Sequence, residues 1–280
     1  MRQESIAEQF AVMNNAYAHY PFSYFLSSMR KLGLNQIDFW CGAPHFYAAE
    51  ATPSKVAGLR NEIMGSGMAV VSYTPEMIPY PYDIAAAEPK LRMRTRDYLC
   101  THIEIANELQ APYMLIPAGK GLMDCQRETN MEAMCEMLGD LAGYAKTGRT
   151  QLVLEHLTTN SSPLVNTSED LAEVLRRVGA ENLHCVLDLG QMSVFGETVS
   201  AFFDRLPDHI RVIHMMDGLP SAHLSFGDGI LPLEKYYDEI LDFGYQGKIV
   251  LEINDRRYLP DPHAALKQCL DRIRLWEDRP

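Results

Sequence analysis

The sequence predicts an α/β protein built as a single (β/α)8 TIM barrel over residues 1–280. Eight short apolar runs of strand length alternate with eight longer segments of helical spacing. The runs are apolar without strict alternation, as in parallel strands that are buried on both faces. A chain of 280 residues fits one such barrel of about 250 residues, and no Ser/Gly-rich linker divides it.

The expected elements follow one another in regular order. The strands are expected at 10–13, 37–40, 69–73, 113–116, 152–155, 183–188, 210–214 and 249–252. The helices are expected at 22–32, 53–64, 88–109, 130–146, 168–178, 198–206, 233–243 and 261–276. Thr52 and Pro53 suit the start of one helix, and Gly33 suits the end of another. An open doubly wound sheet is disfavoured because no glycine-rich phosphate turn follows the first run.

Composition excludes several classes of protein. With 47% hydrophobic and 22% charged residues, the chain has the composition of an ordinary globular protein. The net charge of −12 disfavours nucleic acid and anionic membranes as partners. No apolar stretch approaches the ~20 residues of a membrane span, and the first ten residues lack the pattern of a signal peptide, so we expect a cytoplasmic protein. The six cysteines form no CxxC pair, which disfavours zinc ribbons and disulfide frameworks.

Each of the last four expected strands ends in a polar side chain. These residues are Glu155, Asp188, His214 and Glu252. In a barrel the carboxyl ends of the strands form the active face, so we expect the four side chains to meet there. Taken singly, a strand-end carboxylate often caps the next helix, and a lone histidine is more often structural. Three converging carboxylates would repel one another unless a cation held them, so the pattern predicts a divalent metal site.

The donor set also indicates a reaction class. Three oxygen donors and one imidazole suit Mn²⁺, with Mg²⁺ or Co²⁺ as substitutes. An ion with open positions polarises a substrate carbonyl and makes the neighbouring carbon acidic. The predicted reaction is therefore proton abstraction beside a carbonyl.

Candidates for substrate contact lie at the same end of the barrel. They are Trp40, His45, Tyr73, Glu76, His223 and Asp228. His45 and Glu76 follow proline-containing turns and could bind a sugar hydroxyl, or an ammonium in the case of Glu76, although each could instead only fix its own loop. Trp40 and Tyr73 could form an aromatic wall or pack in the upper core. The last two lie in a glycine-containing loop that could close over the substrate, although it could equally be an ordinary long loop.

Several motifs resemble the sugar phosphate isomerase/epimerase superfamily of xylose isomerase-like barrels. The four strand-end residues occur in the order and strand positions typical of that superfamily. The fructoselysine 3-epimerases are the most similar, and D-tagatose 3-epimerases are more distant. The similar segments are IDFWCGAPHFYA at 37–48, SYTPEMIPYPY at 72–82, LVLEHLT at 152–158, VIHMMDG at 212–218 and HLSFGDGILP at 223–232.

The resemblance implies an epimerase or isomerase that acts on a small sugar. Glu155 and Glu252 would be both metal ligands and the acid/base pair on opposite faces of the substrate carbon. A cis-enediolate would be the intermediate, and its reprotonation would invert the stereocentre. The resemblance also implies a dimer or tetramer.

This chain departs from the related patterns at three positions. D-tagatose-type enzymes have histidine and arginine where this chain has Gln191 and Pro220. Fructoselysine-type enzymes usually have proline where this chain has His156. A histidine there resembles the large subunit of C-glycoside deglycosidases, lyases that work with a small partner subunit. His156 is therefore a candidate base, although strand alternation would turn it away from the metal.

Two other classes are weaker alternatives. A metal-dependent endonuclease of a related barrel would need further His and Glu ligands and a basic groove, which the charge of −12 opposes. A non-catalytic binding barrel would bind its ligand without turnover.

Overall fold

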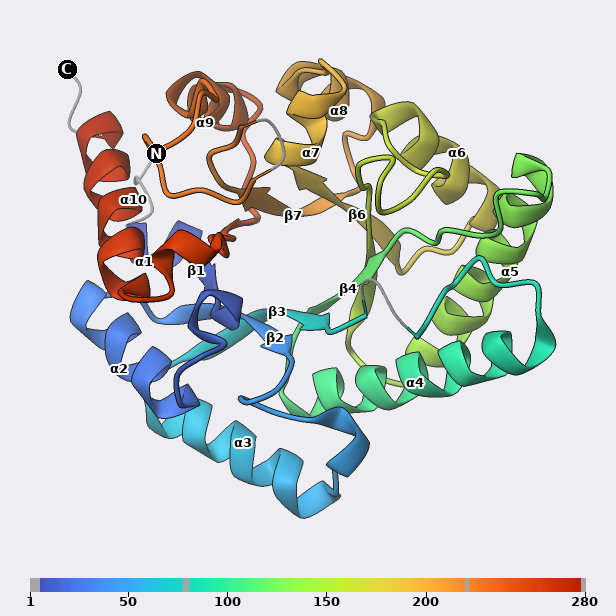
Figure 1. The fold of residues 1–280 in the computed structure, drawn as a ribbon, viewed down its shortest axis with the longest axis horizontal. Helices are drawn as coiled ribbons and strands as arrows, with labels where there is room; N and C mark the ends of the chain where they lie inside the picture. Colours follow the sequence, from blue (N-terminus) through green and yellow to red (C-terminus); the bar gives the residue numbers. More distant parts are fainter. Residues whose placement is uncertain (1–5, 78–80, 220–221, 278–280) are drawn as a thin grey trace.

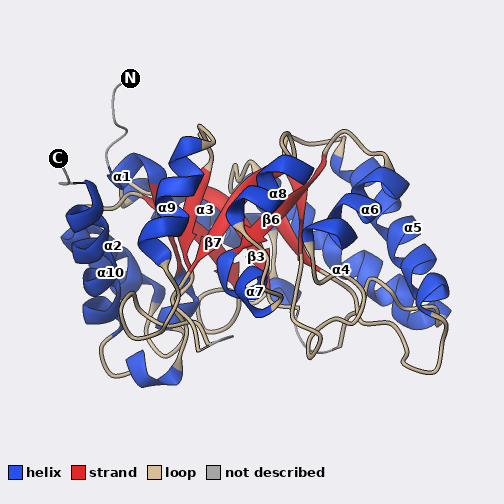
Figure 2. Cartoon of the chain, turned by 90° about the horizontal axis from the view of Figure 1, so that it is seen from above, coloured by secondary structure: helices blue, strands red, loops and turns tan. Residues whose placement is uncertain are grey.

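The computed structural model describes residues 6–77, 81–219 and 222–277. Eight parallel strands form a closed barrel in sequence order, and the last strand pairs with the first. Figure 1 looks down this barrel and shows the helices as an outer ring. Figure 2 shows the strands from the side, enclosed by helices. The predicted (β/α)8 barrel is confirmed.

The strands and helices alternate along the chain. The strands are β1 Phe10–Met13, β2 Gln36–Cys41, β3 Ala69–Pro75, β4 Tyr113–Pro117, β5 Gln151–Glu155, β6 Leu183–Asp188, β7 Ile210–Met215 and β8 Lys248–Leu251. The helices are α1 Ile6–Gln9, α2 Phe22–Leu32, α3 Pro53–Gly65, α4 Pro89–Glu108, α5 Arg127–Ala145, α6 Ser168–Val178, α7 Leu189–Val194, α8 Val199–Arg205, α9 Leu233–Asp242 and α10 Pro262–Glu277. Three short 3-10 helices are η1 Asn14–Tyr17, η2 Ala48–Glu50 and η3 Arg256–Tyr258. Within the described ranges, no helix combines the length and the apolar character needed to cross a membrane.

The expected and observed elements agree at most boundaries. The Thr52 side chain accepts a hydrogen bond from the backbone of α3, and Gly33 ends α2 in the left-handed region with φ 76°. Helix α5 begins at Arg127 rather than at residue 130. Helix α7 was not predicted: its six residues are too few for a periodic pattern, and it begins because the Asp188 carboxylate caps it.

One apolar layer inside the barrel supports the candidate site. Its buried members are Ala11, Met13, Val71, Leu115, Val153, Val186, Val212 and Val250. The last four lie on β5 to β8, each two residues before one of the four polar strand-end residues. Because side chains alternate along a strand, each polar residue points into the barrel directly above an inward valine.

Candidate active site

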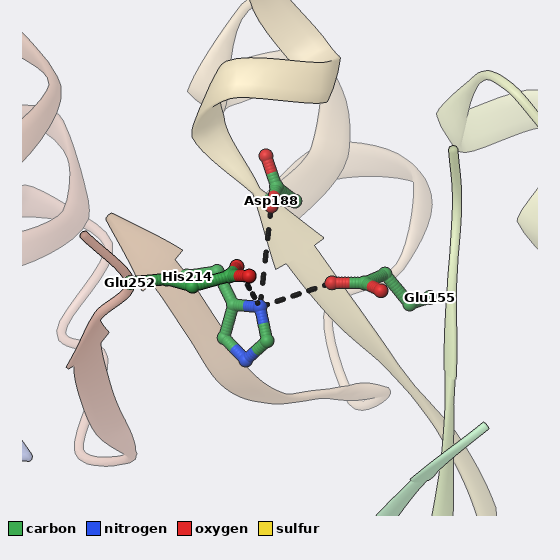
Figure 3. Close-up of side chains that lie close together, drawn as sticks. All are labelled: Glu155, Asp188, His214 and Glu252. Carbon is green, nitrogen blue, oxygen red and sulfur yellow. Dashed lines mark ion pairs between the residues drawn. The ribbon is translucent and has the colours of Figure 1, made fainter. Parts of the chain in front are cut away.

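Glu155, Asp188, His214 and Glu252 meet at the carboxyl end of the barrel, and Figure 3 shows the three carboxylates around the His214 ring. His214 Nδ1 lies 2.9 Å from Glu155 Oε1, 3.1 Å from Glu252 Oε2 and 3.9 Å from Asp188 Oδ2. One ligand atom from each residue lies within 4.8 Å of the others. The structure thus brings together all four residues that the sequence predicted as ligands.

Burial places these charges in conflict. Asp188 and His214 are each 1% exposed. Burial, together with the charges of Glu155 and Glu252, raises the pKa of Asp188 to about 7. Burial also raises the pKa of Glu155, whereas the adjacent His223 and His214 outweigh burial and lower the pKa of Glu252. A cation bound among these side chains would relieve the repulsion between Asp188 and the two glutamates.

The donor atoms fit a divalent ion. Asp188 Oδ2 and both ring nitrogens of His214 are buried and make no hydrogen bond of acceptable geometry. Buried polar atoms normally have partners, and of these three atoms Asp188 Oδ2 and His214 Nδ1 lie on the side where the carboxylates converge, so an ion could bind to both. Three carboxylate oxygens and one imidazole nitrogen suit a hard or borderline cation such as Mn²⁺ or Mg²⁺. The residues therefore form a possible metal-binding group.

Asp38 on β2 belongs to the same site, and our sequence reasoning missed it. Its carboxylate is fully buried and lies 3.6 Å from His214 Nε2, on the other side of the ring from Nδ1. Ser72 and Thr74 on β3 donate hydrogen bonds to it. The available signal was an acid inside an apolar run, since a charged residue is rarely buried without partners.

His156 faces away from the four converging side chains, which corrects its assignment as a base. Its ring is fully buried against Phe202 of α8. Nε2 accepts a hydrogen bond from the Asp188 backbone at 3.2 Å, so Nδ1 donates to the Asn166 carbonyl at 3.2 Å. Strand alternation explains this: Glu155 points into the barrel, and the next residue points out. The deglycosidase alternative depended on His156 facing the substrate and loses that support.

His45 does not present a free ring nitrogen, so its assignment to substrate contact is also corrected. Asn14 lies 2.6 Å from Nδ1, and Nε2 lies 3.0 Å from the Tyr17 carbonyl and 3.1 Å from that of Tyr20. Burial lowers the pKa of His45, which favours the neutral ring. The residue fastens the loop after β2 to the segment after β1.

The two aromatic candidates face opposite ways. Tyr73 is fully buried outside the barrel, 2.5 Å from His102 Nδ1 on α4, so it cannot line the mouth. Trp40 packs against the inner apolar layer, and its indole N–H donates to the Glu76 carboxylate. The indole covers the backbone so closely that any side chain at Gly42 would collide with it. Trp40 and Glu76 thus lie together at the mouth, where partial desolvation raises the pKa of Glu76.

Of the two candidates for substrate contact in the loop after β7, only His223 lies at the site. His223 is partly buried, and its Nε2 lies 3.6 Å from Glu252 Oε2. Asp228 instead accepts hydrogen bonds from Tyr258 at 2.6 Å and Gln268 at 3.0 Å, which tie the loop to η3 and α10. His223 therefore lies beside Glu252, whereas Asp228 holds the loop in place, contrary to its assignment to substrate contact.

Gln191 links the loops around the ligands. Its backbone N–H donates to Asp188 Oδ1 at 2.7 Å, and its side chain accepts from Thr158 N–H at 2.8 Å. It thereby joins the segments that follow β5 and β6. Pro220, the other departure from the D-tagatose-type pattern, lies outside the described residues.

Comparison with known proteins assigns the family. Residues 26–276 match the family described as Xylose isomerase-like TIM barrel. The chain belongs to this family. Within the xylose isomerase-like barrels, it is 28% identical over 256 residues to fructoselysine 3-epimerase of Shigella flexneri, an alignment that covers 91% of this chain and 92% of that protein.

Solved structures show the same barrel. L-ribulose 3-epimerase superposes with a TM-score of 0.81 at 18% identity, over 96% of this chain and 94% of that one. The 3-keto-D-glucoside 4-epimerase from E. coli superposes with a TM-score of 0.80 at 16% identity, over 95% of this chain and 99% of that one. Identities this low show the fold. The family resemblance drawn from the motifs is confirmed.

Proposed function

We propose that the protein is a divalent-metal-dependent sugar epimerase or isomerase that moves a proton at the carbon beside a ketone. The convergence of Glu155 and Glu252 with Asp188 and His214 carries this proposal. The name of the relative from Shigella flexneri, a fructoselysine 3-epimerase, supports the same reaction class. Mn²⁺ is the proposed ion, with Mg²⁺ or Co²⁺ as substitutes.

Two carboxylates from different strands supply the acid and the base. Glu155 is the last residue of β5, Glu252 comes directly after β8, and each lies close to His214 Nδ1. One carboxylate takes the proton from the carbon beside the ketone, and the C–H electrons form a cis-enediolate. The other carboxyl group gives its proton to the opposite face of that carbon, so the stereocentre is inverted. A divalent ion held by Glu155, Asp188, His214 and Glu252 would polarise the substrate carbonyl and stabilise the negative charge that develops on its oxygen.

The proposed substrate is a ketose or a ketose conjugate similar to fructoselysine. Glu76 and Trp40 at the mouth are suited to a hydroxyl or ammonium group and to the apolar face of a sugar. His223 beside Glu252 is suited to a hydroxyl near the reacting carbon. We also propose that the protein is cytoplasmic and forms a homo-oligomer, either a dimer or a tetramer. Light scattering after size exclusion would test the oligomeric state.

Isotope exchange tests the reaction directly. The protein is incubated in D₂O with Mn²⁺ and either a free ketose or fructoselysine, and NMR follows deuterium at the carbon beside the ketone. We expect exchange in the parent and a loss of about 10²–10⁴-fold in Glu155→Gln and in Glu252→Gln. Glu132→Gln, an exposed position on α5, is the matched control.

Two outcomes would contradict the proposal. The first is exchange that survives exhaustive chelation, because the reaction would then need no ion. The second is full exchange in both glutamine variants, because neither carboxylate would then move the proton.

A further inference from the structure

Asp38 is a buried acid that the proposed reaction does not use. Its side chain is fully buried inside the barrel, in the strand across the barrel from the ligand-bearing β6 and β7. Ser72 Oγ donates to Oδ2 at 2.6 Å, and Thr74 Oγ1 donates to Oδ1 at 2.9 Å. The two hydroxyl groups hold this buried acid in place at a position where an apolar side chain would otherwise pack.

The two nitrogens of His214 face different groups. Nε2 lies 3.6 Å from Asp38 Oδ2, whereas Nδ1 faces Glu155 at 2.9 Å and Glu252 at 3.1 Å. A distance of 3.6 Å exceeds a normal hydrogen bond, but it is short enough for the carboxylate to attract an N–H group on the nitrogen that faces it. A neutral imidazole carries one proton, and its place decides which nitrogen can bind a cation.

We propose that Asp38 is a positioning residue that keeps the His214 proton on Nε2 and turns the Nδ1 lone pair toward the ligand carboxylates. Ser72 and Thr74 donate hydrogen bonds to the Asp38 carboxylate from the β3 side, and these bonds hold it in the orientation that faces His214. This inference rests on the proposed metal site. Partners of this kind typically change metal affinity by about 10- to 100-fold.

Metal affinity is the first test, and it needs no turnover. Mn²⁺ binding to the chelator-stripped protein is measured by calorimetry in the parent, Asp38→Asn and Ser72→Ala. We expect Asp38→Asn to weaken binding by about 10- to 100-fold, since it removes the charge and keeps the shape. We expect Ser72→Ala to change it by less than about threefold, because the carboxylate and its Thr74 hydrogen bond remain.

The second test reads the proton position in the parent protein, and one variant serves only to assign the signals. The protein is labelled with ¹⁵N-histidine and loaded with Zn²⁺ as a diamagnetic probe, and the His214 signals are assigned by their loss in His214→Gln. We expect the tautomer with the proton on Nε2. The tautomer with the proton on Nδ1 would overturn the inference.

The outcomes separate this inference from the proposed function. A parent that binds no divalent ion contradicts the metal site itself. A parent that binds Mn²⁺ while Asp38→Asn binds it equally well overturns only the positioning role. Equal weakening in Asp38→Asn and Ser72→Ala also overturns it, because that result indicates packing alone.

Discussion

Replacing Asp188 with asparagine should stabilise the metal-free protein at alkaline pH. Burial and the charges of Glu155 and Glu252 raise the pKa of Asp188 from its usual 3.8 to about 7 in the folded protein. The folded state therefore binds a proton that the unfolded chain has lost, and this stabilisation is complete below about pH 4 and disappears as pH rises to about 7. At about 1.4 kcal/mol per pH unit, the parent loses about 2 kcal/mol through Asp188 between pH 5.5 and pH 8.

Asparagine removes the charge and keeps the local structure. Asp188 Oδ1 accepts a hydrogen bond from Gln191 N–H at the start of α7, and asparagine caps helices equally well. The assay is urea unfolding in EDTA at pH 5.5 and pH 8.0, followed by circular dichroism. We expect the stability of Asp188→Asn relative to the parent to rise by about 2 kcal/mol between the two pH values. Saturating Mn²⁺ should reverse the order at pH 8, because only the parent keeps all four ligands.

Parallel pH dependence of the parent and Asp188→Asn in EDTA would refute this reasoning. It would mean that Asp188 is ionised at no cost, and that the four side chains do not crowd one another in the metal-free protein.

Three further predictions concern two residues near the candidate site and one buried histidine on α4. His156→Ala should lower the free energy of unfolding by about 2–4 kcal/mol, because two buried backbone groups lose their partners, and should leave isotope exchange within about tenfold of the parent; a catalytic base would show a far larger loss of exchange. Burial lowers the pKa of His102 to about 3, so its contribution to stability falls by about 2 kcal/mol between pH 6.5 and pH 5, where only the unfolded chain takes up the proton. In urea unfolding, His102→Gln should therefore lose less stability than the parent between pH 6.5 and pH 5. An equal loss in both proteins would contradict the lowered pKa of His102. Glu76→Gln should raise KM for a ketose conjugate more than it lowers kcat, and an unchanged KM would remove Glu76 from the substrate site.

Local sequence patterns determined the barrel and the four polar side chains that converge at its mouth. Apolar runs and helical segments alternate without interruption, and this series specifies parallel strands with helices between them. Glu155, Asp188, His214 and Glu252 were found because each ends an apolar run. Inward and outward faces alternate with period two, and a closed barrel collects all carboxyl ends at one mouth, so these positions follow from order along the chain.

Tertiary structure decided which of the other polar and aromatic residues reach the site. His45 is bonded to Asn14, 31 residues away, and Asp38 to Ser72, 34 residues away, and such partners leave no local pattern. Tyr73 faces α4 because the register between β2 and β3 shifts beside Asp38, which changes the faces that their side chains occupy. Facing direction and hydrogen-bond partners depend on strand pairing across the barrel, and only the folded chain specifies that pairing.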